Sequence, residues 1–214
     1  VSKNVIGYEI DRELKPVLSD LAEKNTNLEI IFDDFLKRDI KKDVSNYEYD
    51  NIYVVSNLPY YITTPIIIKL IEEKINIKKI VIMIQEEVGN RFSAKPNSKE
   101  YNSLSIFLNY YFNIKKLFTV SRNVFVPKPN VDSVVIEFSK KEQKYNVLDE
   151  NIFFKLVKDS FKQKRKTLKN NLNNYDFDII KEVLNQRGFK DSVRAEQIDI
   201  TTFIEIANKI KLSK

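Results

Sequence analysis

The chain has 214 residues, of which 43% are hydrophobic and 31% charged, a composition typical of a globular protein rather than a disordered or fibrous one. It contains no cysteine and no histidine, which excludes disulfides, thiolate chemistry and most metal sites, and leaves carboxylates, amides, aromatic rings and a cofactor to carry any reaction. The net charge of +6 comes entirely from residues 151–214, with 14 basic and 8 acidic side chains, and such a basic segment favours a nucleic-acid partner. The sequence shows no bilayer-spanning apolar run and no signal peptide, so we expect a cytoplasmic protein without a membrane partner.

Apolar, β-branched runs alternate with helical patterns over the first part of the chain. The expected strands are Val5–Ile10, Leu28–Phe32, Asn51–Ser56 and Lys79–Ile84, and the expected helices are Arg12–Lys24 and Thr64–Lys74. Continuous apolar runs of this kind suit strands buried on both faces of a parallel sheet. Two later runs, Ile114–Val120 and Val131–Phe138, are close enough to form an antiparallel pair at a sheet edge. The pattern predicts a doubly wound α/β domain with ligands at the carboxyl ends of its strands.

Acidic residues follow the first two expected strands. A carboxylate at the position of Glu9 can accept hydrogen bonds from both ribose hydroxyls of a nucleoside cofactor. Asp34 can accept from an adenine amino group, and Phe35 can cover the ring. The simpler alternatives are a solvated loop residue for Glu9 and a helix cap for Asp34 or Asp33. The predicted cofactor-binding residues are Glu9, Ile10, Asp34, Phe35 and Asn57.

The segment Asn57-Leu58-Pro59-Tyr60 follows directly on a buried strand and has the pattern of enzymes that methylate amino nitrogens of planar groups. An exocyclic amine is a poor nucleophile because its lone pair is delocalised into the ring. The Asn57 side-chain oxygen and the Leu58 carbonyl, accepting its two N–H bonds, would free that lone pair. Pro59 restricts the preceding residue to extended backbone, and Tyr60 offers a face for an extruded base. An ordinary strand-to-helix turn is the alternative.

A proline-stiffened loop carries Phe125, which completes the predicted catalytic set. Its ring could close on the second face of the target base, opposite Tyr60, although a core aromatic is the commoner role of a single Phe. The polar loop at 91–102 could border the same cleft.

Residues 141–150 are polar and without period, and we interpret them as a linker between a catalytic domain at 1–140 and a helical, basic domain at 151–214. The clearest helical pattern spans Ile152–Leu172, with apolar side chains on one face. The predicted RNA-binding residues lie on the opposite face: Lys155, Lys158, Lys162, Arg165, Lys166 and Lys169. Seven of the 15 residues from 155 to 169 are basic and only Asp159 is acidic, so this helix would repel itself unless phosphates neutralise it. A solvated face is the alternative.

Taken in order, these segments resemble the KsgA family of ribosomal RNA adenine dimethyltransferases. The resemblance covers nearly the whole chain and rests on Tyr8-Glu9-Ile10-Asp11, Asp34-Phe35-Leu36, Asn57-Leu58-Pro59-Tyr60, Phe125–Ser133, Gln163–Leu168, Asn170-Asn171-Leu172 and Arg194-Ala195-Glu196-Gln197. It implies a Rossmann-like methyltransferase domain with a small all-helical C-terminal domain, S-adenosylmethionine as the methyl donor, and no metal. It also implies dimethylation of two adjacent adenosines in a 3′-terminal hairpin loop of small-subunit (16S) ribosomal RNA, on the immature 30S subunit, by a monomer.

One family feature has no counterpart in the sequence. The family carries a Gly-x-Gly-x-Gly loop upstream of the Tyr-Glu-Ile-Asp strand, whereas the three glycines here are Gly7, Gly89 and Gly188. We therefore expect an N-terminally truncated chain that lacks the first strand and the glycine loop, binds the cofactor poorly and is inactive as written.

Two alternative functions stay open on the sequence. A non-catalytic ribosome-assembly factor is favoured by the missing glycine loop, but the retained Asn57-Leu58-Pro59-Tyr60 turn argues against it. The erythromycin-resistance methylases, which act on large-subunit RNA, are also similar, yet they usually carry Ile in place of Leu58 and lack the Arg-Lys-Thr-Leu and Arg-Ala-Glu patterns.

Overall fold

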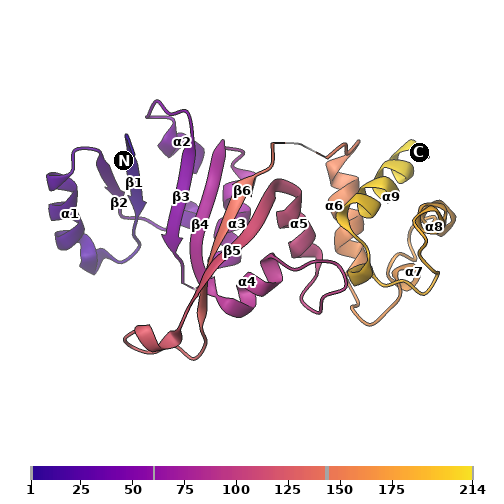
Figure 1. Cartoon of the computed structure of the whole chain (residues 1–214). Helices are drawn as coiled ribbons and strands as arrows, with labels where there is room; N and C mark the ends of the chain where they lie inside the picture. The colour runs from indigo at the N-terminus through magenta and orange to yellow at the C-terminus, as the bar shows by residue number, and fades with distance from the viewer. Residues whose placement is uncertain (1, 60, 143–144, 214) are drawn as a thin grey trace. The chain divides into compact units, whose positions relative to one another are not determined.

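The structure, a computed structural model, describes residues 2–59, 61–142 and 145–213 (Figure 1). The chain divides into two compact units, the first made of Val1–Tyr53 and Leu58–Lys78 and the second of Val54–Asn57 and Lys79–Lys214. Each unit is compact by itself. This division does not fall at 141–150, and the domain arrangement 1–140, 141–150 and 151–214 remains a prediction.

The first unit is built on two parallel strands. Its elements are β1 (Val5–Tyr8), η1 (Arg12–Leu14), α1 (Lys15–Lys24), β2 (Leu28–Ile31), η2 (Phe35–Lys37), α2 (Ile40–Val44) and α3 (Thr63–Glu72). The strands pair from Val5 opposite Leu28 to Tyr8 opposite Ile31. Because parallel strands end at the same edge, the acidic residues that follow β1 and β2 come to one side of this unit.

The larger sheet has the strand order β3-β4-β6-β5. Its strands and the helices between them are β3 (Ile52–Asn57), β4 (Ile77–Gln85), α4 (Glu86–Phe92), α5 (Ser103–Tyr111), β5 (Phe112–Val120), η3 (Arg122–Val124) and β6 (Ser133–Lys140). β6 runs antiparallel to both β4 and β5. All six predicted strands form, and the predicted antiparallel pair at a sheet edge is confirmed.

Isoleucines of β4 and apolar residues of β6 form the centre of this sheet. Ile80, Ile82 and Ile84 are buried and lie opposite buried Phe138, Ile136 and Val134. The prediction of strands buried on both faces is wrong for β3, where Tyr53, Val55 and Asn57 are exposed in alternation with less exposed residues. Because alternate side chains of a strand point to opposite faces, only one face of β3 is covered.

The C-terminal part of the second unit is helical, as predicted. Its elements are α6 (Glu150–Ser160), α7 (Leu168–Asn171), α8 (Phe177–Gln186), η4 (Ala195–Gln197) and α9 (Ile200–Leu212), which lie together in Figure 1. Their apolar faces enclose a core that includes Phe153, Leu168 and Phe203, and that also takes in Tyr101 and Ile106 from the α5 region.

The loop between α4 and α5 is hydrogen-bonded to this helical part at three places. The Tyr101 hydroxyl donates to the Ile198 carbonyl at 3.1 Å, and the Asn97 N–H donates to the Glu196 carbonyl at 2.8 Å. The Lys164 ammonium donates to the Lys99 carbonyl at 2.6 Å. The predicted polar loop at 91–102 therefore packs along the helical region rather than projecting freely.

The predicted helix Ile152–Leu172 is wrong in its length. α6 ends at Ser160, and α7 begins only at Leu168. The Asn171 amide group donates to the Ser160 carbonyl at 2.8 Å and to the Gln163 carbonyl at 3.1 Å, and its oxygen accepts from the Gln163 N–H. These bonds and the Thr167 cap of α7 stabilise a loop in place of continuous helix.

Within the described ranges, none of the helices has both the length and the apolar character needed to cross a bilayer.

Gly89 brings α4 close to β6, since an added Cβ would collide with the Cγ1 of Val134. Val134 is buried and β-branched, so it cannot rotate away easily. We expect Gly89→Ala to lower the free energy of unfolding by about 1–3 kcal/mol in urea titrations. Combining it with Val134→Ala should cost less than the sum of the two single losses, and strict additivity would contradict the clash. Glu87→Ala, at an exposed position of α4, is the control.

Candidate functional site

The carboxyl ends of β1 and β2 bring Glu9 and the Asp33-Asp34 pair to one edge of the first unit. The Glu9 N–H donates to the Ile31 carbonyl at 3.0 Å, and the Asp33 N–H donates to the same carbonyl at 3.1 Å. Glu9 and Asp33, the residue before Asp34, are therefore hydrogen-bonded to a single backbone acceptor.

The carboxylates of Glu9 and Asp34 are held by local hydrogen bonds. Glu9 Oε1 accepts from the Asp11 N–H at 2.8 Å, and Asp34 Oδ1 accepts from the Leu36 N–H at 3.0 Å. The capping role considered for Asp34 is thus confirmed, because this bond caps η2. Among the residues that the structure describes, none donates a hydrogen bond to Glu9 Oε2 or Asp34 Oδ2, although Lys37 Nζ lies 3.8 Å from the latter.

This edge offers the chemistry that an adenosyl group needs. The Glu9 and Asp34 carboxylates can accept from ribose hydroxyls and from an adenine amine, and half-buried Phe35 lies next to Asp34. The Phe35 ring meets the Tyr8 ring edge-on, with centroids 5.0 Å apart, while Ile10 is exposed beside Glu9. The residues present therefore fit the adenosyl part of S-adenosylmethionine.

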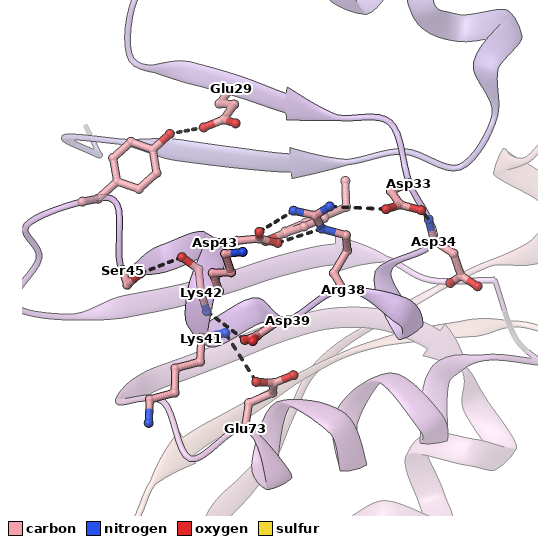
Figure 2. A network of polar contacts seen from close by, with 12 residues as sticks. Glu29, Asp33, Asp34, Arg38, Asp39, Lys41, Lys42, Asp43, Ser45 and Glu73 are labelled. Carbon is pink, nitrogen blue, oxygen red and sulfur yellow. Dashed lines mark hydrogen bonds and ion pairs between the residues drawn. The ribbon is translucent and has the colours of Figure 1, made fainter.

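Arg38 and Asp43 form a polar network at the same edge (Figure 2), and the Tyr8 hydroxyl joins it. Arg38 donates from Nη2 and Nε to the buried Asp43 carboxylate at 2.5 and 3.1 Å, and the Tyr8 hydroxyl donates to Asp43 Oδ2 at 3.1 Å. Hydrogen bonds from Arg38 outweigh burial and hold the pKa of Asp43 below its usual value. Burial and the adjacent Asp43 carboxylate raise the pKa of Tyr8, so its phenol remains a donor.

Sequence reasoning missed Arg38 and Asp43. They are five residues apart on either side of a cap, a spacing that marks neither a helix face nor a strand face. The contact arises only because the chain turns between η2 and α2.

The predicted amine-binding turn follows β3. Asn57 is the last residue of the strand and its side chain is exposed, whereas Leu58 is buried. The Pro59 carbonyl accepts from the Ile62 N–H at 3.2 Å and from Thr63 Oγ1 at 3.3 Å, which leads the chain into α3. Among the described residues, none forms a hydrogen bond with the exposed Asn57 side-chain amide. Tyr60 lies outside the described residues, and the boundary between the two units falls between Asn57 and Leu58.

Phe125 follows η3 on the loop that joins β5 to β6, in the same unit as Asn57. It is half-buried and does not belong to the buried core, so the core alternative is wrong. Arg122 secures the two sides of the loop: its N–H donates to Asp132 Oδ1 at 2.9 Å, and its Nη1 donates to the Asn130 carbonyl at 2.8 Å.

The basic residues predicted on one helix face are in fact distributed over α6, the loop 161–167 and α7. Asp159 is buried and pairs with Lys155 at 2.6 Å and Lys162 at 2.8 Å. It also accepts from the Tyr175 hydroxyl at 2.7 Å. Asp159 therefore offsets part of the charge that was expected to repel, and the prediction that these residues share one helix face is wrong.

Three of the predicted RNA contacts keep their charge open to solvent. Lys158, Arg165 and Lys166 are exposed, and no carboxylate of the described residues lies within ion-pair distance of them. Lys169 instead lies over the Phe177 ring, 5.7 Å from its centroid. An open hollow of about 360 Å³ is lined by Gln163, Lys164, Arg165 and Lys166.

The family model of ribosomal RNA adenine dimethylases matches residues 1–212. The chain belongs to this family. The ribosomal RNA small subunit methyltransferase A of Bacillus mycoides (strain KBAB4) is 42% identical over 222 residues, covering 100% of this chain and 76% of the relative. The protein of the same name from Bacillus cereus (strain B4264) is 42% identical over 223 residues, with the same coverage. The resemblance to KsgA-type dimethyltransferases is confirmed.

Solved structures show that this adenine dimethylase has the predicted Rossmann-like fold. A dimethyladenosine transferase from Plasmodium falciparum superposes with a TM-score of 0.77 at 25% identity, covering 96% of this chain and 81% of that one. The 23S rRNA methyltransferase ErmE gives a TM-score of 0.75 at 18% identity over 98% of this chain and 83% of its own, which shows a shared fold.

In this dimethylase, Asp159 is expected to stabilise the helical part. Burial raises its pKa, but hydrogen bonds from Lys155, Lys162 and Tyr175 outweigh that effect and hold the pKa below its usual value. Replacing it with Asn should lower the free energy of unfolding by about 1–3 kcal/mol at pH 7.

The sign of the pH dependence follows from the lowered pKa. The stability that Asp159 contributes is present above the unfolded-state pKa of about 3.9 and is lost as the pH falls through the lower folded-state value. The gap between the wild-type protein and Asp159→Asn in urea titrations should therefore shrink from pH 7 to about pH 3. A gap independent of pH would contradict the ionic role. Asp191→Asn, from an exposed pair with Lys181, is the control.

Proposed function

We propose that this adenine dimethylase transfers methyl groups from S-adenosylmethionine to the N6 amino groups of two adjacent adenosines in a 3′-terminal hairpin loop of small-subunit ribosomal RNA. The observation that carries the proposal is the exposed Asn57 amide at the end of β3, followed by Leu58 and Pro59. The names of the 42% identical relatives support the small-subunit substrate.

The cofactor is assigned to the edge formed by β1 and β2. S-adenosylmethionine, when bound, supplies a methyl group attached to a positively charged sulfonium. The sulfur is a good leaving group, so the donor needs no further activation. Glu9 would accept from the ribose hydroxyls and Asp34 from the adenine amine, with Ile10 and Phe35 against the base. Asn57 completes the predicted cofactor-binding set.

The turn after β3 is assigned to the target adenine. The Asn57 side-chain oxygen and the Leu58 carbonyl would accept the two N–H bonds of the amine and raise its nucleophilicity. Tyr60 and Phe125 would stack on the two faces of the extruded base. Positioning then supplies most of the acceleration. The methylated amine loses its proton readily to water, which suits a chain without histidine.

The RNA backbone is assigned to the basic residues of the C-terminal part. Lys158, Arg165 and Lys166 have the open charges, so we expect them to make the main phosphate contacts. Lys155, Lys162 and Lys169 would contribute less, because they already interact with Asp159 or Phe177. We place the reaction in the cytoplasm, on the immature 30S subunit, with the protein acting as a monomer.

Neither alternative function is favoured. The likeness to ErmE at 18% identity concerns the fold and carries no argument for large-subunit RNA. A purely RNA-binding assembly factor has no use for an exposed amide followed by an amine-accepting carbonyl.

In an enzyme that also carries the family's glycine loop, Asn57→Ala should lower methyl transfer to undermethylated small subunits by roughly 100-fold or more, because one of two preorganised acceptors is lost. Labelled-methyl incorporation measures the rate, and filter binding should show RNA affinity within about twofold of the wild-type protein. Asn57→Asp, which keeps an acceptor oxygen, should retain part of the activity. Asn113→Ala, at an exposed position of β5, is the matched control. Wild-type rates for Asn57→Ala would refute the assignment.

Arg165→Gln and Lys166→Gln should each weaken RNA binding at all sequences and reduce the slope of log affinity against log salt by about 1. Lys155→Gln should change the slope less, since its ammonium is paired with Asp159. Titrations between about 50 and 200 mM salt give the slopes. Equal changes in slope for Lys155→Gln and Arg165→Gln would contradict the idea that pairing with Asp159 keeps Lys155 from contacting phosphates.

A further inference from the structure

Asp43 is the centre of a network that has no assigned role in the reaction. Its carboxylate is buried and accepts three hydrogen bonds, from Arg38 Nε and Nη2 and from the Tyr8 hydroxyl. A carboxylate bonded to a guanidinium fork is among the strongest and most directional polar contacts in proteins. Asp43 therefore fixes Arg38 and Tyr8 against α2.

One arm of this network leads to Asp34. Arg38 Nη1 reaches Asp33 Oδ2 at 3.4 Å, and Asp33 Oδ1 accepts from the Asp34 N–H at 2.8 Å. Figure 2 shows the Arg38 side chain between the Asp43 and Asp33 carboxylates. The orientation of the Asp34 backbone is thus tied to Arg38 through a single carboxylate.

The other arm leads to Glu9. Tyr8 directly precedes Glu9, its hydroxyl is held by Asp43, and its ring meets Phe35 edge-on. Each carboxylate assigned to the cofactor is therefore one residue away from a member of the network. Without Arg38, Asp43 would be a buried carboxylate lacking its cation, and Asp33 would lose its only neighbouring charge partner among the described residues.

We propose that Arg38 and Asp43 are positioning residues, which set the separation and direction of Glu9 and Asp34 so that both can bind one adenosyl group. Tyr8 carries the effect to Glu9 and Asp33 carries it to Asp34. The inference rests on the proposed function, because it takes the adenosyl part of the cofactor as the ligand of this edge.

The decisive experiment is direct binding. Calorimetry with S-adenosylhomocysteine and with adenosine is run on the whole chain, well below the unfolding temperature of every variant. Arg38→Met should weaken both affinities by about tenfold, and by the same factor, because the network acts on the nucleoside half that the two ligands share. Arg38→Lys should stay weakened, since an ammonium cannot bond both carboxylates as a fork does.

Lys41→Met is the matched control. It removes one positive charge from the adjoining helix α2, and in Figure 2 the Lys41 side chain points away from the Arg38–Asp43 pair. Its affinities should stay within about twofold of the wild-type protein. A general loss of stability would lower the unfolding temperature of a variant without changing the affinity of the folded protein.

Several outcomes would overturn the inference: unchanged affinity in Arg38→Met, full affinity in Arg38→Lys, an equal loss in Lys41→Met, or no binding of either ligand by the wild-type chain. The proposed function fails separately. A chain that binds S-adenosylhomocysteine with the expected Arg38 dependence but methylates no RNA would refute the function and support the positioning role. Methylation with an unchanged KM for the cofactor in Arg38→Met would support the proposed function and refute the positioning role.

Discussion

The arrangement at the edge proposed to bind the cofactor depends on one backbone acceptor, the carbonyl of Ile31. It closes the parallel β1–β2 ladder by accepting from Glu9 and turns the chain by accepting from Asp33. The strand ladder thereby delivers a carboxylate from each of two segments to one edge of the first unit. The cap of η2 and the Arg38–Asp43 pair stabilise the segment that follows β2.

Features that depend on short stretches of sequence were predictable. The six strands are rich in apolar and β-branched residues, and the candidate residues Glu9, Asp34 and Asn57 lie at or just after strand ends, so both could be located from local pattern alone. The length of the helix expected at 152–172 could not be predicted in this way. Phe161 and Leu168 both pack toward the same core, which preserves the helical spacing across a break. The break is made by Asn171, through bonds to backbone groups eight and eleven residues away, and periodicity carries no information about them.

The availability of positive charges in the C-terminal part also could not be predicted from local sequence. A count along the sequence treats Asp159 as one acid against seven bases. In the fold, this one carboxylate is buried at the point where two lysines and a tyrosine converge, so it decides which cations stay available. Arg38 and Asp43 were missed for a related reason, because their pairing depends on a turn between two capped helices and on no motif.

The three hydrogen bonds between the α4–α5 loop and the helical part have a consequence for how this protein can diverge. Asn97, Lys99 and Tyr101 bond backbone or side-chain groups that lie about 65 to 100 positions later in the chain. A helical segment transplanted from a relative would leave the Tyr101 hydroxyl and the Asn97 amide without their acceptors unless its own turn at 195–198 matched. Exchanging residues 94–101 together with the helical part should keep these bonds, whereas exchanging either one alone puts them at risk.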